Sequence, residues 1–164
     1  MTAQEIHDKI QGKFPDTIVE FNDSVLQPYI KLTANQFNEV CQYLRDEDDF
    51  DFDALMNLSG VDYGENLGTV YHLLSMKHRH KIVLKVDVAR DQAEIPTVAD
   101  LWRTADWHER EVYDLFGVDF KDHPDLRRIL LPDDWEGYPL RKDYVTPQTY
   151  EGITIPYPEE KGEN

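Results

Sequence analysis

The chain has 164 residues, the length of one domain with some excess, and its 17 Lys and Arg against 33 Asp and Glu give a formal charge of −16. That charge opposes binding to nucleic acid and to anionic lipid headgroups, so neither is expected as a direct partner. The single cysteine excludes an internal disulfide, and no apolar run approaches the roughly 20 residues that span a bilayer.

The first 32 residues are predicted to form a helix followed by two strands. Thr2 and Glu5 have the spacing of a capping box, so a helix is expected over about residues 3–14. Residues 17–21 and 28–32 are short runs separated by the turn-forming sequence FNDS, a pattern that is typical of two strands.

A second helix is predicted to begin with a capping box from Thr33 to Gln36. Its apolar residues recur at helical spacing, at Phe37, Val40, Cys41 and Leu44. Cys41 therefore belongs to a buried stripe, where a packing role is expected. The acidic run that follows, residues 46–53, lacks the glycine and the closing glutamate of an EF-hand calcium loop, so a solvated loop is expected.

Three longer strands are predicted in the middle of the chain, over residues 54–63, 68–77 and 81–90. His78 and His80 fall in the turn between the last two, and they are interpreted as solvated turn residues because no third metal ligand is near. The order of elements predicts an α+β fold, a two-layer sandwich of helices on one face of a mixed β-sheet.

Two helices are predicted in the next stretch. The apolar pattern indicates a short helix over residues 98–102, and Asp106 with Glu109 indicates the N-terminal cap of a longer one. Gly117 is expected to end the longer helix, because glycine readily adopts the left-handed conformation found there.

On one face of the longer helix, His108, Glu111 and Asp114 fall about one turn apart, which is the spacing of a divalent-metal site. A stand-alone metal-dependent enzyme is therefore one functional hypothesis. H-x-x-E pairs often occur by chance, however, and acids near a helix start are expected from the helix dipole, so a structural role is favoured. The chain holds no nucleotide-binding glycine motif and no G-x-S-x-G nucleophile elbow.

The last part of the chain has a different character. It is rich in Pro, Arg, Tyr and Trp and shows little helical or strand periodicity. Arg, Trp and Tyr are enriched at protein–protein interfaces, because they combine large contact area with directional hydrogen bonds. We therefore expect a domain over residues 1–131 and an extended, partner-binding tail over residues 132–164.

Several blocks between Asn57 and Tyr144 resemble the 30 kDa subunit family of respiratory complex I, the proton-pumping NADH:quinone oxidoreductase. The family motif is matched in order and spacing by Glu109-Arg110-Glu111, Asp114-Leu115-Phe116, His123, Arg127 and Ile129-Leu130. The blocks LSGVDY, VYHLLS and YPLRKDY extend the resemblance.

The resemblance implies a non-redox structural subunit of the peripheral arm, which braces subunits D and B at the quinone end. Neighbouring iron–sulfur subunits are further candidate partners. It implies no cofactor in this chain, because FMN and the iron–sulfur clusters belong to partner subunits. The implied location is the cytoplasmic face of a bacterial inner membrane, with membrane contact only through the complex. The equivalent subunit of a membrane-bound hydrogenase or another related dehydrogenase is an alternative.

From the resemblance and from the interleaved charges, ten residues are predicted to form a subunit interface. They are Glu109, Arg110, Glu111, Asp114, His123, Arg127, Arg128, Arg141, Lys142 and Asp143. Outside the metal hypothesis above, no catalytic, cofactor-binding or metal-ligating residue is expected.

Overall fold

The computed structural model describes residues 1–154, so the final ten positions of the predicted tail lie outside the described residues. Within that range the helices are α1 (Ala3–Lys13), α2 (Phe37–Asp46), α3 (Arg103–Phe116) and the short 3₁₀ helix η1 (Arg90–Gln92). The strands of the main sheet are β1 (Ile18–Asn22), β2 (Tyr29–Leu32), β3 (Ala54–Asp62), β4 (Asn66–Leu74) and β5 (Lys81–Ala89). Two short pairs are β6 (Glu94–Pro96) with β7 (Asp119–Lys121), and β8 (Thr149–Tyr150) with β9 (Ile153–Thr154).

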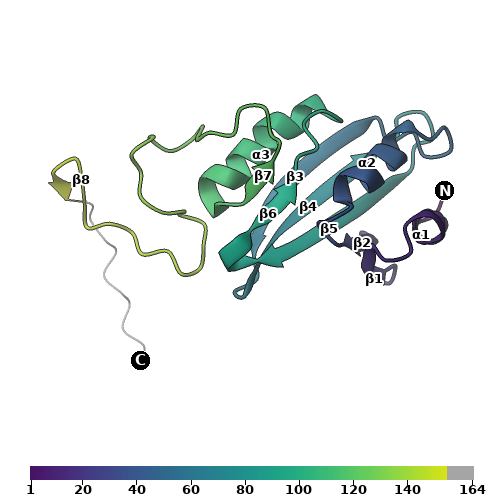
Figure 1. Cartoon of the computed structure of the whole chain (residues 1–164), viewed down its shortest axis with the longest axis horizontal. Coiled ribbons are helices and arrows are strands. Elements are labelled where there is room, and N and C mark those ends of the chain that lie inside the picture. The colour runs from purple at the N-terminus through teal and green to yellow at the C-terminus, as the bar shows by residue number, and fades with distance from the viewer. Residues whose placement is uncertain (155–164) are drawn as a thin grey trace.

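The main sheet is mixed, as predicted. Its five strands lie in the order β1-β2-β5-β4-β3, and only β2 and β5 run parallel. One row of paired residues crosses all five strands with apolar side chains: Phe21, Ile30, Leu84, Tyr71 and Leu58. Helices α2 and α3 cover this face (Figure 1), so the two-layer α+β prediction is confirmed.

Helix α1 follows the sequence prediction closely. Thr2 accepts a hydrogen bond from the Glu5 amide, and the Glu5 carboxylate accepts one from the Thr2 amide, which completes the capping box. Ile6 and Ile10 are fully buried, so the apolar stripe of this helix faces the core.

The start of α2 was predicted wrongly. The helix begins at Phe37. Gln36 occupies the capping position before it and makes no side-chain hydrogen bond to the helix. The proposed capping box fails because its two ends have other partners: the Thr33 amide donates to the Thr17 carbonyl, and the Gln36 amide oxygen accepts from the Thr17 hydroxyl. Thr33 thus continues the pairing of the preceding strands.

Helix α3 also differs from its prediction at the N-terminus. Residues 98–102 form a turn and no separate helix, and α3 begins at Arg103 with no side-chain cap. Asp106 lies in the first turn, where its carboxylate bonds Arg110 four residues on. Gly117 ends the helix in the left-handed conformation with φ of 70°, as predicted.

The two turn histidines are less solvated than predicted. His80 is buried, and its Nε2 lies 2.7 Å from the Phe50 carbonyl oxygen. His78 Nε2 lies at the same distance from the Asp48 carbonyl. These contacts, with the burial of Phe50, tie the acidic run to the β4–β5 turn, although its carboxylates remain at the surface.

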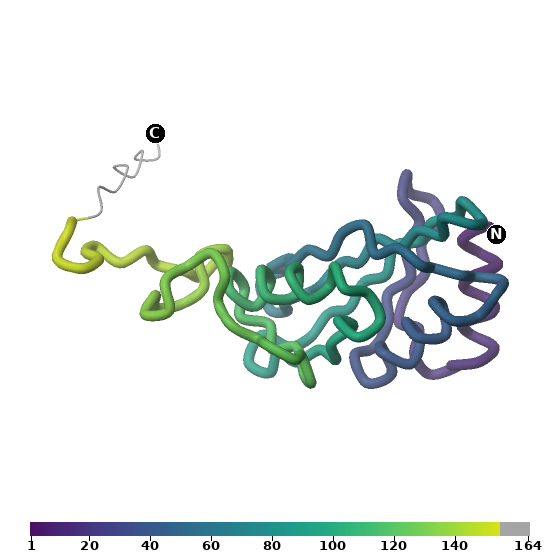
Figure 2. Tube along the Cα trace, turned by 90° about the horizontal axis from the view of Figure 1, so that it is seen from above, coloured from purple at the N-terminus to yellow at the C-terminus, as the bar shows by residue number. Residues whose placement is uncertain are grey.

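The segment after β7 leaves the sheet at the end opposite α1, and both views show this separation (Figure 1, Figure 2). Neither the parallel β6–β7 pair nor the β8–β9 hairpin was predicted, because two- and three-residue strands are too short to show alternation. Up to Asp143 the segment makes hydrogen bonds to the body of the protein, for example from the Leu140 amide to the Leu115 carbonyl. The predicted boundary at residue 131 therefore does not mark the end of contact with the domain.

Candidate partner-docking site

Helix α3 places its charged residues in two environments. Phe116 packs against β3 at Gly60, where a Cβ would lie only 2.5 Å from the Phe116 ring. Glu109 and Asp114 both lie in the interior and are 0% exposed, Asp114 because residues 128–131 cover it. Glu111, on the other side of the helix, is exposed. The predicted interface residues of α3 are thus divided between core and surface.

Asp114 holds the segment after β7 against the helix. Its Oδ2 accepts hydrogen bonds from three successive amides, those of Ile129, Leu130 and Leu131, at 3.0, 2.7 and 3.0 Å. Its Oδ1 accepts one from Arg128 Nη1 at 2.8 Å. Burial by itself raises the pKa of Asp114, but these donors outweigh it and lower the pKa, so the carboxylate is ionised. We refer to Asp114 with residues 128–131 as the Asp114 anchor.

A second buried carboxylate, Asp62 at the end of β3, fixes the chain farther along. It accepts hydrogen bonds from the Lys142 amide at 2.7 Å, the Gly64 amide at 2.7 Å and Arg90 Nη2 at 2.5 Å. Arg90 also donates to Asp143 at 2.8 Å. Burial raises the pKa of Asp62, but the hydrogen bonds from these groups prevail and lower it to about 2. We refer to these five residues as the Asp62 anchor.

Arg141 closes the C-terminal end of α3. Its Nε donates to the Phe116 carbonyl at 2.6 Å and its Nη2 donates to the Gly117 carbonyl at 3.3 Å. The guanidinium also lies 4.6 Å from the centre of the Tyr138 ring. A cation at the carbonyl end of a helix is favourable, because it satisfies oxygens that have no partner within the helix.

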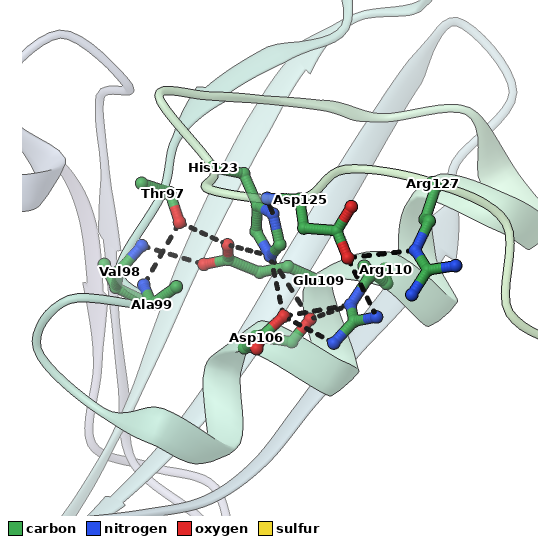
Figure 3. Close-up of polar contacts among 9 residues, drawn as sticks. All are labelled: Thr97, Val98, Ala99, Asp106, Glu109, Arg110, His123, Asp125 and Arg127. Atoms are coloured by element: carbon green, nitrogen blue, oxygen red, sulfur yellow. Dashed lines mark hydrogen bonds and ion pairs between the residues drawn. The ribbon is translucent and has the colours of Figure 1, made fainter.

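Glu109 occupies a different kind of site, shown in Figure 3. Its carboxylate accepts hydrogen bonds from the Thr97 hydroxyl at 2.5 Å and the Val98 amide at 2.8 Å, both in the turn before α3. Burial is the main cause that raises the pKa of Glu109 to about 7, and the carboxylates of Asp106 and Asp100 add to it. The two hydrogen bonds act in the opposite direction and do not compensate.

His123 reaches the same site from the segment after β7. Its Nδ1 accepts a hydrogen bond from the Asp125 amide at 3.0 Å, so the proton of the neutral ring resides on Nε2. Nε2 lies 3.2 Å from the Asp106 carbonyl oxygen, to which it donates, and 3.8 Å from Glu109 Oε2. The ring is therefore neutral in this arrangement and does not balance the charge of an ionised Glu109.

Charged residues continue from this site to the surface. Arg110 pairs with Asp106 at 2.8 Å and lies 3.7 Å from Asp125, which in turn pairs with Arg127 at 2.9 Å. The Arg110 guanidinium stacks 4.3 Å from the centre of the Trp107 ring. Trp107 is 61% exposed and the Arg127 side chain is 68% exposed. This edge of α3 therefore presents an aromatic ring and a cation to solvent.

The structure places all ten predicted interface residues on α3 or in the segment after β7. The side chains of Glu109, Asp114 and His123 have no exposed area, so in this conformation they contact only their own chain. Arg128, Arg141 and Asp143 also have internal partners, and Lys142 is held through its backbone. Glu111, Arg127, Lys142 and Asp143 are the members that present their charge at the surface.

The metal hypothesis finds no support in the part of the chain that the structure describes. No group of three or more His, Cys, Asp or Glu side chains there could hold a metal ion. Asp114 has four donors around its carboxylate, whereas Glu111 points into solvent. The helical spacing of the proposed ligands does not bring them to one point.

Three residues of the site were missed by the sequence analysis: Asp62, Arg90 and Thr97. The position of Asp62 two residues before Gly64 is a local sign of a turn, since its carboxylate accepts the Gly64 amide. No local pattern indicates that Asp62 also meets the Lys142 amide, 80 residues away in sequence.

The segment after β7 and the adjacent edge of α3 expose several large apolar side chains. They are Trp107, Leu130, Leu140, Val145 and Ile153. Apolar groups gathered in one region of a surface are typical of sites where a partner binds. Leu130 and Leu140 lie on backbone whose amides are bound to Asp114 and to the Leu115 carbonyl.

Comparison with known proteins identifies the family. Residues 30–150 match the family described as the 30 kDa subunit of respiratory-chain NADH dehydrogenase. The chain belongs to this family. The resemblance seen in the sequence between Asn57 and Tyr144 is thereby confirmed, and the match includes β2 to β8.

Two relatives of this 30 kDa family are named as the C subunit of NADH-quinone oxidoreductase. The one from Chlorobium phaeobacteroides is 45% identical over 159 residues, which are 94% of this chain and 96% of the relative. The one from Chloroherpeton thalassium is 44% identical over 151 residues, which are 90% of this chain and 63% of the relative. Some relatives are thus considerably longer, and the chain covers 52% of the one from Saccharopolyspora erythraea.

Solved structures agree with the 30 kDa subunit fold. A trypsin-resistant fragment of Nqo5, described as residues 1–134, superposes with a TM-score of 0.65 at 28% identity, covering 77% of this chain and all of the fragment. A chain of the archaeal membrane-bound sulfane sulfur reductase superposes with a TM-score of 0.73 at 24% identity over 98% of both chains, which shows a shared fold. Among residues 1–154, none of the helices has the length and apolar character needed to cross a membrane.

Proposed function

We propose that this chain is the 30 kDa component of a quinone-reducing NADH dehydrogenase complex and acts there as a non-redox brace. In this role its exposed segment after β7 docks on subunits D and B at the quinone end, with neighbouring iron–sulfur subunits close by. NADH oxidation on FMN, electron transfer through iron–sulfur clusters and quinone reduction would take place in those other subunits. The chain would reach the cytoplasmic face of the membrane only through the complex.

The observation that carries this proposal is the combination of exposed apolar side chains with a fixed backbone. Leu130 is 61% exposed although its amide is bound to buried Asp114. A side chain presented in this way loses little conformational freedom when a partner covers it, so a preorganised surface binds more tightly than a mobile one. The nearby Trp107 and Arg127 are residue types that often dominate binding energy.

Purification of the tagged full-length chain from detergent-solubilised membranes of its host tests the assignment. The quinone-end subunits of an NADH dehydrogenase are expected in amounts equal to the bait. Recovery of the bait alone would contradict the proposal. Recovery of hydrogenase or sulfur-reductase subunits would favour the alternative complex, which the fold shared with the sulfane sulfur reductase chain also permits.

Two variants test the docking surface itself. Leu130→Ser keeps the backbone amide on Asp114 but removes the apolar side chain, and its expected cost on docking is about 1–2 kcal/mol, roughly a tenfold loss of recovered partner. Arg127→Ala removes an exposed cation and is expected to give a smaller loss. The matched control is Leu26→Ser, because Leu26 is 98% exposed in the β1–β2 connection. Equal recovery from Leu130→Ser and from the control would count against docking here.

A further inference from the structure

The charge balance around Glu109 is unusual for a buried carboxyl group. Buried carboxylates are normally paired with a cation or surrounded by enough donors to hold the negative charge, as Asp114 is. Glu109 is 0% exposed, and among residues 1–154 its hydrogen-bond donors are only the uncharged Thr97 hydroxyl and Val98 amide. Arg110, its neighbour on α3, turns toward Asp106 and Asp125 instead.

The other titratable groups around Glu109 do not supply positive charge. From the five elements packed around it, they are Asp106 on α3, Asp100 in the preceding turn, His123 after β7, Cys41 on α2 and Tyr71 on β4. The two aspartates repel an ionised Glu109. His123 is neutral, because its Nδ1 accepts the Asp125 amide. Cys41 and Tyr71 are buried, and both have a raised pKa, so they too are uncharged.

The hydrogen bonds of Glu109 accommodate either protonation state. The Thr97 hydroxyl oxygen accepts from the Ala99 amide at 3.1 Å, and its own proton can point toward Glu109. When Glu109 is protonated, its O–H can instead donate to the same Thr97 oxygen, which has a second lone pair. The site therefore binds a proton without rearrangement of the backbone.

We propose that Glu109 is a proton-binding group of the folded subunit, and that its charge state controls how firmly the 121–127 segment is held on α3. His123 is the link between the two, since its buried ring covers Glu109 and belongs to that segment. If the segment separates from α3, Glu109 is exposed to water, and its pKa returns to the ordinary value for glutamate. Protonation of Glu109 therefore favours the closed arrangement, and ionisation favours opening.

The direction of the pH dependence follows from the two states. Burial raises the pKa of Glu109 to about 7 in the closed arrangement, against an ordinary value of 4.5 in the open one. Between these values the closed state binds more protons, so closure weakens as pH rises toward 7. From pH 6 to pH 8 the ionisation of Glu109 by itself is expected to increase the equilibrium constant for opening about tenfold, by proton linkage.

Amide hydrogen exchange of the full-length chain measures this opening directly. The His123 and Asp125 amides report it, because the first donates to the Phe120 carbonyl of β7 and the second to the His123 ring, which is buried beside Glu109 in the closed arrangement. After correction for intrinsic exchange rates, their protection relative to that in Glu109→Gln is expected to fall about tenfold from pH 6 to pH 8, because any pH dependence that does not come from Glu109 is common to both chains. The glutamine of Glu109→Gln is a permanently neutral mimic of the protonated acid, so this variant lacks the contribution of Glu109. In the control Glu111→Gln, a change at an exposed position of the same helix, it should persist.

A second measurement does not depend on any variant folding correctly. In wild-type chain with ¹³C-labelled glutamate, the side-chain carboxyl resonance of Glu109 should titrate near neutral pH, well above the ordinary glutamate value of 4.5. Titration of Glu109 near 4.5, or an undiminished tenfold fall of protection in Glu109→Gln, would overturn the proposal. Both experiments use the isolated chain, so their outcome is separate from that of the partner-docking experiments.

Discussion

Two carboxylates lie inside the protein on the same helix, five residues apart, and their donors give them opposite proton affinities. Asp114 receives an arginine and three amides, which keep it charged. Glu109 accepts hydrogen bonds from one hydroxyl and one amide, and the effect of burial on its pKa is larger than theirs. Both residues belong to the same sequence motif. The charged Asp114 fixes a neighbouring segment, whereas Glu109 is a weak acid that can be neutral in the folded protein.

Asp114→Asn tests the Asp114 anchor. The amide has one acceptor oxygen in place of two, and its NH₂ group would face the donors of residues 128–131. Loss of one partner of a buried ion pair costs about 3–5 kcal/mol, so the free energy of unfolding should fall by that order. Urea denaturation measures the fall, and Glu111→Gln serves as the control with a change below about 0.5 kcal/mol. A loss below about 1 kcal/mol would show that Arg128 finds other partners.

The contribution of the Asp62 anchor to the free energy of unfolding should decrease in acid. Because the folded pKa of Asp62 is about 2 and the ordinary value is 3.8, this carboxylate stabilises the folded chain above pH 4, and the contribution is lost as pH falls toward 2. Asp62→Asn should therefore be less stable than wild type at pH 6, and the difference should shrink below pH 3. Urea midpoints measured from pH 2 to pH 6 test this, and a constant difference would contradict it.

At the scale of elements, the position of α3 on the sheet depends on Gly60 in β3. The Phe116 ring occupies the space that a side chain at residue 60 would need. Both anchors start from this pair of elements, because Asp114 belongs to α3 and Asp62 ends β3. A shift of the helix along the strand would therefore move the whole segment after β7.

Gly60→Ala should disturb this packing. Its Cβ would lie 2.5 Å from the Phe116 ring, and forcing an extra carbon into a packed core costs about 1–3 kcal/mol. Gly12→Ala is the matched control, because residue 12 lies in α1 with nothing within 4 Å of the added Cβ, and alanine there should stabilise by about 0.5–1 kcal/mol. Thermal denaturation should move the two midpoints in opposite directions. A stable Gly60→Ala variant would mean that α3 adjusts freely.

At the scale of the whole molecule, the protein consists of a sandwich and a long segment that extends from its α3 end (Figure 2). The segment was expected to order only on a partner. The structure instead ties it to the domain at residues 128–131 by Asp114 and at residues 141–143 by Arg141 and the Asp62 anchor. Partner binding by residues 132–164 stays a prediction, and its last ten positions lie outside the described residues.

Hydrogen exchange of the isolated chain should show where the ordered segment ends. The amides of Leu140 and Lys142 are bound to the Leu115 carbonyl and to Asp62, so they should be protected without any partner. Asp62→Asn should reduce the protection of Lys142 at least tenfold, while amides of the Asp114 anchor should be unaffected. Fast exchange of both Leu140 and Lys142 in wild-type chain would instead support a tail that is free until it meets its partner.

The sequence determined the parts of this protein that depend on neighbours in the chain. The α1 capping box, the long strands β3 and β5 and the helix-ending Gly117 have local signals, and each appears where it was predicted. The family is also evident from the sequence, because the motif of α3 and the following segment has a fixed order and spacing. The second capping box failed, since Thr17, in the turn before β1, is hydrogen-bonded to the Thr33 amide and to the Gln36 side chain.

Only the tertiary structure decided which charged residues face a partner and which face the protein. Glu109 and Glu111 are two residues apart, yet one is buried under His123 and the other is exposed, because the segment after β7 crosses one side of α3 only. Asp62 meets Lys142 across 80 residues, and no local pattern encodes such a contact. Burial and long-range pairing also set the proton affinity of each carboxylate, since a pKa depends on the solvent and charges that the fold places around the group.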